Sequence, residues 1–117
     1  MQKKVFLSRF WIIQIFVCFS LIQGVKASSL ESGKDLFLAN CNICHLNGNN
    51  IIIPEKSLKK DALEENGMNT IDAICYQILN GKNGMPAFGG RLKEVEIEAI
   101  AKYVLQQSLK NFQIEKN

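Results

Sequence analysis

The apolar residues of this chain recur at the spacing of an α-helix in three segments. Residues three and four positions apart lie on one face of a helix, so each segment predicts a short amphipathic helix. The apolar positions are Leu30, Phe37 and Leu38 in the first segment, Ile71, Ile74, Cys75, Ile78 and Leu79 in the second, and Ile97, Ile100, Ala101, Val104 and Leu105 in the third. No alternating run is long enough for a strand, residues 51–53 being the nearest. The pattern therefore predicts an all-α fold.

Capping and helix-breaking residues set the limits of these helices. Asn69 or Thr70 can cap the second helix and Gly81 can end it. Residues 58–65 hold good helix formers and stop at Asn66-Gly67, which predicts one more short helix. Residues 46–54 and 81–90 are rich in Asn, Gly and Pro and predict irregular loops. Such loops are expected where the chain wraps around something instead of packing on itself.

The start of the chain has the features of an export signal. Residues 1–9 carry a positive charge and precede an apolar stretch over residues 10–22. Val25 and Ala27 are small residues at the −3 and −1 positions of a cleavage site. An uncleaved membrane anchor is the alternative, but spanning a bilayer takes about 20 apolar residues, and Gln14 and Ser20 interrupt this shorter run. We therefore predict a cleaved signal peptide over residues 1–27, a single domain over residues 28–117 and no stable membrane insertion.

The charge balance argues against a nucleic-acid partner. The 117 residues include 14 Lys and Arg and 11 Asp and Glu, a formal charge of +3. Lys3, Lys4, Arg9 and Lys26 belong to the predicted signal peptide, which holds no acidic residue. The remaining domain is nearly neutral and lacks the basic face of a nucleic-acid binder. Its size excludes a large enzyme and predicts a thin core that a bound cofactor or a covalent cross-link would support.

Cys41-Asn42-Ile43-Cys44-His45 is a C-x-x-C-H pentapeptide, the attachment signature of c-type haem. Two thiols three residues apart near a helix end can add to the two vinyl groups of one porphyrin, which aims the next imidazole at the iron. Three alternatives compete: a thioredoxin-like redox pair in a βαβ context, a structural zinc site with four ligands, and a plain Cys41–Cys44 disulfide. The chain has one histidine and no βαβ pattern. We predict covalent haem c on Cys41 and Cys44, with His45 as an axial iron ligand.

The second axial ligand is predicted to be a methionine. Met68 and Met85 are the two methionines of the predicted domain. Met85 lies in a loop whose glycines and proline allow close backbone approach, whereas Met68 precedes a helix and is expected to be a packing residue. A His45/Met85 pair raises the reduction potential and fills both axial positions, so we predict one-electron transfer and not catalysis. A haem sensor or a peroxidase-type protein is the alternative if Met85 is not a ligand.

Two further side chains have predicted environments. A ligating imidazole usually donates its other N–H to a second group, and we expect His45 to donate to a backbone carbonyl in the loop that contains Pro54. Cys75 shares a helical face with Ile74 and Ile78, which predicts a buried small hydrophobic residue. The alternative for an odd cysteine in an exported protein is intermolecular pairing.

These features resemble the class I cytochromes c, and more closely the small soluble cytochromes c6 of algal plastids and cyanobacteria, over nearly all of residues 31–109. The segments that carry the resemblance are Cys41-Asn42-Ile43-Cys44-His45, Gly48-Asn49-Asn50-Ile51-Ile52-Ile53-Pro54-Glu55-Lys56, Asn66-Gly67-Met68, Tyr76-Gln77, Asn80-Gly81-Lys82-Asn83 and Met85-Pro86-Ala87-Phe88-Gly89-Gly90-Arg91-Leu92. The resemblance implies about four short helices wrapped around one covalently attached haem. It also places Gly33, Phe37 and Tyr103 where the first and last helices cross. The chain departs from the family pattern at Gly84, often an alanine, and near Phe112, where the family has a tryptophan.

The resemblance further implies a soluble one-electron carrier of photosynthetic electron transport. Such a carrier shuttles electrons from the cytochrome b6f complex to photosystem I in the thylakoid lumen of a plastid. Arg91 is similar to the docking arginine of the family and Gln77 to a residue that tunes the potential, while Glu64, Glu65 and Asp72 are expected to face a basic partner surface. We expect a monomer with at most weak self-association. The alternatives are a cyanobacterial thylakoid protein and a bacterial-type periplasmic cytochrome c that donates to a terminal oxidase.

Overall fold

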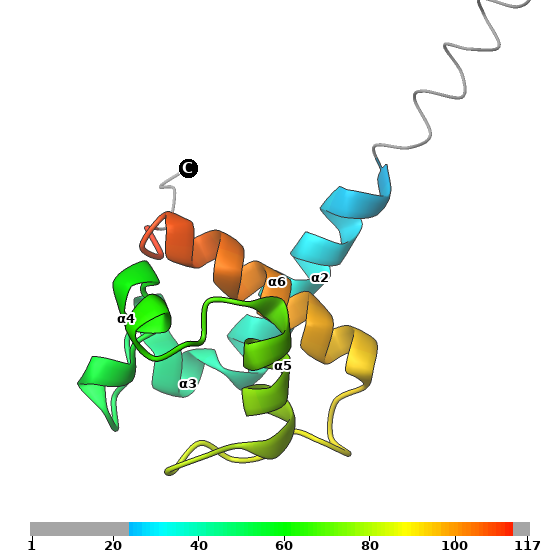
Figure 1. The fold of residues 1–117 in the computed structure, drawn as a ribbon. Helices are drawn as coiled ribbons and strands as arrows, with labels where there is room; N and C mark the ends of the chain where they lie inside the picture. The colour runs from blue at the N-terminus through cyan, green and yellow to red at the C-terminus, as the bar shows by residue number, and fades with distance from the viewer. Residues whose placement is uncertain (1–23, 114–117) are drawn as a thin grey trace, which may run out of the picture.

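The computed structural model describes residues 24–113, and their side chains from Ser32 onward. Its elements are α2 (Gly24–Asn40), α3 (Asn42–His45), the 3-10 turns η1 (Leu46–Gly48) and η2 (Pro54–Lys56), α4 (Lys60–Glu65), α5 (Ile71–Asn80) and α6 (Glu94–Leu109) (Figure 1). Over these residues there is no strand, only two isolated bridges. The predicted all-α class is confirmed.

The predicted signal peptide lies almost wholly outside the described residues, since residues 1–23 are not described. Within the range that is described, no helix is long and apolar enough to cross a membrane.

The ends of α5 follow from its capping residues. The Thr70 side chain accepts a hydrogen bond from the Ala73 backbone N–H at 3.2 Å, so Thr70 is the N-cap and not Asn69. Gly81 ends the helix with a φ of 65°, a conformation that favours glycine. α4 begins at Lys60, two residues later than predicted, because the Leu58 N–H bonds to the Gly48 carbonyl at 2.7 Å.

α2 and α6 cross at Gly33, and α5 packs against α6 (Figure 1). A Cβ on Gly33 would overlap the carbonyl oxygen of Ala99 and lie 3.2 Å from Cβ of Tyr103, so only glycine allows this approach. The Phe37 ring lies 5.3 Å from the Tyr103 ring and 5.9 Å from the Phe112 ring, measured between centroids. The predicted crossing is confirmed, and Phe112 takes part in it.

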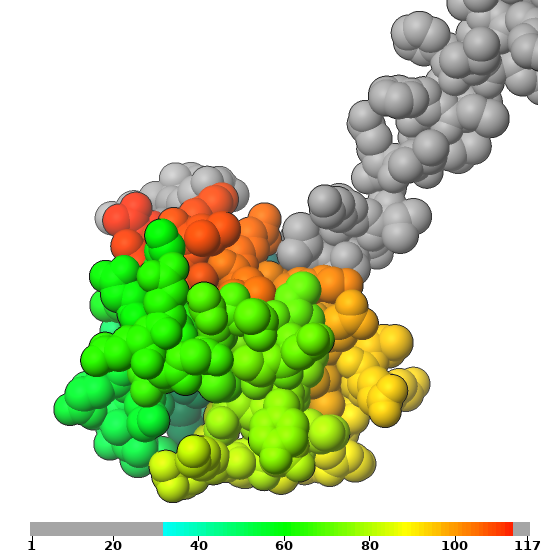
Figure 2. Space-filling view, in the orientation of Figure 1, coloured from blue at the N-terminus to red at the C-terminus, as the bar shows by residue number. Residues whose placement is uncertain are grey.

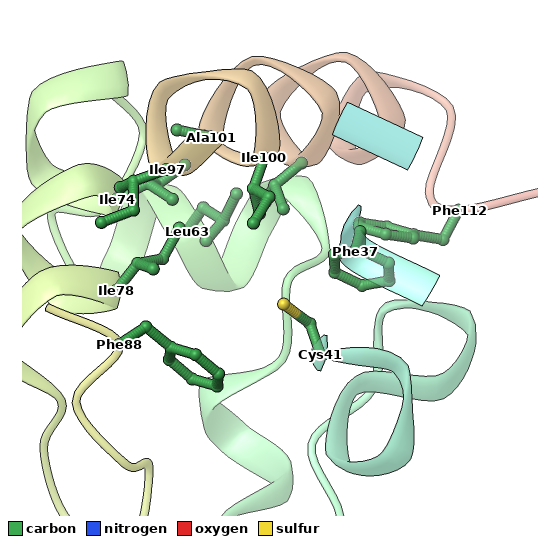
Figure 3. Packing of buried hydrophobic residues seen from close by; sticks show 11 residues of the cluster. Phe37, Cys41, Leu63, Ile74, Ile78, Phe88, Ile97, Ile100, Ala101 and Phe112 are labelled. Atoms are coloured by element: carbon green, nitrogen blue, oxygen red, sulfur yellow. The ribbon is translucent and has the colours of Figure 1, made fainter. Parts of the chain in front are cut away.

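The core lies between α2, α4, α5 and α6 (Figure 3). Its buried members are Phe37, Cys41, Leu63, Ile74, Ile78, Phe88, Ile97, Ile100, Ala101, Val104 and Phe112. Several of them also line a cavity that opens to one side. Figure 2 shows the surface hollowed between the green segment that follows α3 and the yellow-green segment that follows α5.

Candidate functional site

A cavity of about 240 Å³ lies between the two predicted loops and the core helices. Its apolar wall is made by residues of α2, α3, α4, α5 and α6 and of both loops. These apolar residues are Phe37, Ile43, Ile52, Ile53, Leu58, Ala62, Leu63, Ile74, Ile78, Pro86, Phe88, Ile100 and Val104. No carboxylate is among the lining residues, while Lys56 and Lys82 are. Such a cavity suits a mainly apolar group that also carries negative charge.

One turn of helix brings the C-x-x-C-H residues onto the cavity wall. α2 ends at Asn40, and the backbone N–H groups of Cys44 and His45 bond to the Cys41 carbonyl at 3.1 and 2.9 Å. Cys41, Cys44 and His45 all line the cavity, and the sulfur of Cys41 points toward Ile100 and Leu63 (Figure 3). Both cysteines are free thiols, so no Cys41–Cys44 disulfide is present.

Burial keeps the Cys41 thiol uncharged. Only 8% of Cys41 is exposed, and burial, with a smaller contribution from nearby Cys44, raises the Cys41 pKa to about 11. A thiolate would therefore be costly at this position. A thioether carries no charge, so a cysteine consumed by covalent attachment fits this apolar wall.

The orientation of His45 is set by a backbone carbonyl. His45 Nδ1 lies 3.0 Å from the Asn49 carbonyl oxygen, and because a carbonyl only accepts, Nδ1 carries the proton and Nε2 keeps its lone pair. Burial lowers the His45 pKa, which the bond to Asn49 partly opposes. The lowered pKa and the protonated Nδ1 are both consistent with a neutral imidazole whose Nε2 lone pair is available to a metal. The predicted acceptor, a backbone carbonyl of the loop that contains Pro54, is confirmed as that of Asn49.

Met85 is placed on the same cavity by a tight turn. The backbone N–H of Lys82 bonds to the Met85 carbonyl at 3.1 Å, and the Met85 N–H bonds to the Lys82 carbonyl at 3.0 Å. Asn83 and Gly84 complete the turn with φ values of 50° and 90°. The Gln77 side-chain amide donates to the Met85 sulfur at 3.7 Å, and both residues line the cavity. Gln77 therefore faces the site, as predicted.

The other candidate residues have different environments. Met68 packs against the core, as predicted, but it also lines the cavity. Cys75 is half-buried instead of buried and does not line the cavity. Its α5 position brings it near Asp72 on its own helix and near Glu98 and Lys102 on α6, and burial and the two carboxylates raise its pKa. Among the described residues there is no group of three or more His, Cys, Asp or Glu that could hold a metal ion, as a zinc site requires.

The structure brings to the cavity residues that the apolar pattern does not single out and that the sequence shows only within the segments that resemble the family. Asn50, Asn66 and Lys56 form a polar edge of the cavity, and Lys56 Nζ donates to Asn66 Oδ1 at 3.3 Å. Ile52 faces the opposite loop: a Cβ built on Gly84 would lie 3.5 Å from Ile52 Cδ1. A run of apolar and amide residues outside any helix carries no periodic signal, so only the fold locates these groups at the cavity.

The fold and this cavity define a class I cytochrome c. A family model described as "Cytochrome C oxidase, cbb3-type, subunit III" matches residues 28–104. Cytochrome c6 of Bumilleriopsis filiformis is 62% identical over 81 residues, which cover 69% of this chain and 94% of that protein. Cytochrome c6 of Pyropia yezoensis is 53% identical over 112 residues, which cover 96% of this chain and all of that protein (100%).

A solved structure agrees with these relatives. The structure of cytochrome c6 from the diatom Phaeodactylum tricornutum superposes with a TM-score of 0.68 at 45% identity, covering 70% of this chain and 97% of that one. The chain belongs to the cytochrome c6 family. It is therefore a haem electron carrier with a covalently bound c-type haem, and not an enzyme.

Proposed function

We propose that Cys41 and Cys44 would hold the haem through two thioethers, and that His45 Nε2 and Met85 Sδ would bind its iron. The observation that carries this proposal is that all four residues lie on the wall of one cavity, with the His45 tautomer already set by Asn49. The Cys41 and Cys44 side chains would hold the group covalently through their sulfur atoms. The bound haem supplies one-electron exchange between ferrous and ferric iron.

The protein residues prepare this site for rapid electron exchange. The apolar wall excludes water, and the neutral imidazole of His45 needs no proton to leave before it binds a metal. The soft sulfur of Met85 favours the ferrous state, and Gln77 donates to that same sulfur. Hydrogen bonds hold the backbone around His45 and Met85 and the ring of His45. Little therefore has to move in the protein when the charge of a bound iron changes.

Single-cysteine variants test the attachment. In Cys41→Ser and Cys44→Ser proteins made with the full chain, we expect one thioether to be lost in each, read from the alkaline pyridine haemochrome spectrum of the purified protein. Cys75→Ser is the matched control, because Cys75 does not line the cavity, and it should keep both thioethers. Two thioethers in either of the first variants would contradict the assignment.

We further propose that the protein is exported by the cleaved segment 1–27 and works in the thylakoid lumen between the cytochrome b6f complex and photosystem I. Membership of the cytochrome c6 family supports this role. The exposed rim of the cavity supports transient docking, since Ile43 is 83% exposed and Ile52 is 55% exposed while both line the cavity. Small apolar contacts of this kind suit short-lived redox complexes.

Charged residues of the surface would steer the encounter. The Arg91 guanidinium lies 4.9 Å from the centroid of the Phe88 ring, and Phe88 lines the cavity, so a cation is held next to the site. Glu64, Glu65 and Asp72 are exposed and are proposed to face a basic surface of photosystem I. Such charges change the association rate more than the stability of the complex.

Oxidation kinetics with isolated photosystem I test the docking. We expect Arg91→Gln to lower the second-order rate constant, and we expect higher ionic strength to reduce the difference from the wild type. Lys59→Gln is the matched control, because Lys59 is exposed and does not line the cavity. Equal rate constants for the Arg91 variant and the wild type, with no dependence on salt, would contradict the steering model.

A further inference from the structure

The Asn50 side chain holds one wall of the cavity with three hydrogen bonds. Its Oδ1 accepts from the backbone N–H groups of Ile52 at 3.0 Å and Ile53 at 2.9 Å. Its Nδ2 donates to the Lys56 carbonyl at 3.1 Å. Asn50 is half-buried and lines the cavity itself. One side chain therefore ties together a segment of seven residues that has no regular ladder of its own.

This segment contains the carbonyl that orients His45. The Asn49 carbonyl, which accepts from His45 Nδ1, belongs to the peptide that joins Asn49 to Asn50. On the side of the motif, the Ile51 N–H bonds to the Cys44 carbonyl at 3.1 Å and the Asn49 N–H to the Leu46 carbonyl at 3.0 Å. On the other side, the Leu58 N–H bonds to the Gly48 carbonyl at 2.7 Å, and the Asn50 side chain anchors the chain that follows the acceptor. Without Asn50, the peptide that carries the acceptor loses three of the bonds that hold the chain after it.

We propose that Asn50 is a positioning residue for His45, an inference that rests on the proposed role of His45 as an axial ligand. The three bonds of its side chain fix the Asn49–Asn50 peptide, and that peptide fixes the tautomer and the ring orientation of the imidazole. Outer partners of a ligating histidine set its basicity as well as its orientation. A loosened Asn49 carbonyl would therefore make His45 a weaker donor, which stabilises ferric iron less.

The same anchor holds the residue that faces the opposite loop. Ile52, whose backbone N–H donates to Asn50 Oδ1, faces Gly84 next to Met85, since a Cβ built on Gly84 would lie 3.5 Å from Ile52 Cδ1. The hydrogen bonds of the Asn50 side chain all lie on the histidine side of the cavity, and the effect on His45 is therefore the one to test.

Two substitutions at Asn50 test the proposal in the haem-loaded protein. Asn50→Ala removes all three bonds, and Asn50→Ser keeps a neutral acceptor for the Ile52 and Ile53 N–H groups but does not reach the Lys56 carbonyl. Asn80→Ala is the matched control, because Asn80 also donates to a carbonyl, that of Tyr76 at 2.8 Å, but is exposed and does not line the cavity. The readouts are solvent exchange of the His45 Nδ1 proton, by NMR of the ferrous protein, and the midpoint potential.

In the Asn50→Ala protein we expect exchange of this proton to be about tenfold faster or more, since several hydrogen bonds are lost, together with a higher midpoint potential. In both measurements the Asn50→Ser protein should give values between those of Asn50→Ala and wild type. If the alanine variant does not assemble with haem, the serine variant still tests the proposal. The Asn80 variant should match the wild type in both measurements.

Two results would overturn the proposal. Exchange and potential equal to wild type in both Asn50 variants would show that the Asn49 carbonyl needs no such anchor. A lower midpoint potential with unchanged exchange of the His45 Nδ1 proton would mean that Asn50 acts only through the exposed rim of the cavity and not through His45. Failure of the proposed function is distinguishable, because the wild-type ferrous spectrum would then lack the signals of an iron-bound imidazole.

Discussion

Replacing Gln77 by valine is expected to lower the midpoint potential. The Gln77 amide N–H points its positive end at the Met85 sulfur, 3.7 Å away. Added positive charge on the iron is therefore disfavoured, and the reduced state is relatively stabilised. Valine fills a similar space without a donor, so water does not replace the amide. The expected sign is a shift toward lower potential.

The geometry sets the size of this shift. A net hydrogen bond is worth about 0.5–1.5 kcal/mol, and a sulfur acceptor at this distance places the bond in that modest range. For a one-electron couple, a tenfold change in the equilibrium constant is about 59 mV, which converts the range to about 20–65 mV. Spectroelectrochemical titration of the haem-loaded protein resolves a shift of this size.

Gln106→Val is the control for this experiment. Gln106 is exposed on α6 and does not line the cavity, and the substitution carries the same helix cost of a β-branched residue. Its potential should equal that of the wild type. An unchanged or raised potential in the Gln77 variant would refute the argument that an oriented amide acts on the methionine sulfur.

Three further perturbations follow from the packing and from the site. Gly33→Ala should lower the free energy of unfolding, measured by urea titration, by about 1–3 kcal/mol, because the new Cβ overlaps backbone of α6. The control is Ser32→Ala at the exposed neighbouring position, which should leave the free energy of unfolding unchanged. Equal losses of stability in the two variants would contradict a close crossing of α2 and α6 at Gly33. Met85→Ala should abolish the weak long-wavelength absorption of a thioether bound to ferric iron and let carbon monoxide bind; retention of that absorption would assign the ligand elsewhere. Alkylation of Cys75 in the haem-loaded protein should be slow at neutral pH and accelerate with rising pH, because burial and nearby carboxylates raise the Cys75 pKa and reduce the thiolate fraction. Glu98→Gln should speed it by lowering that pKa, and an unchanged rate would contradict this electrostatic account.

Helix positions were predictable because each helix has a local cause. The apolar period of residues 71–79 and the Thr70 and Gly81 signals correspond to α5 at Ile71–Asn80. The start of α4 was predicted two residues early, because a bond between Leu58 and Gly48 across the loop decides it. A contact between segments ten residues apart leaves no periodic trace in sequence.

Cys75 shows a second limit of the apolar pattern. Its spacing from Ile74 and Ile78 predicted burial, but the residue is half-buried beside charged residues of α6. Periodicity identifies the apolar face of a helix, whereas the edge of that face depends on which helix packs there. That information belongs to the packing of α5 on α6 and not to α5 alone.

The sequence by itself determined the all-α class, the C-x-x-C-H chemistry and Met85 as the favoured second ligand, because these depend on residue type, local period and fixed spacing. Only the tertiary structure decided that Cys41, His45 and Met85 share one cavity, that Asn49 orients the imidazole, and that Gln77 reaches the methionine sulfur. The physical reason is range. Helix periods and thiol spacing act over a few residues, whereas a cavity exists only after helices remote in the chain have packed and left a space between them.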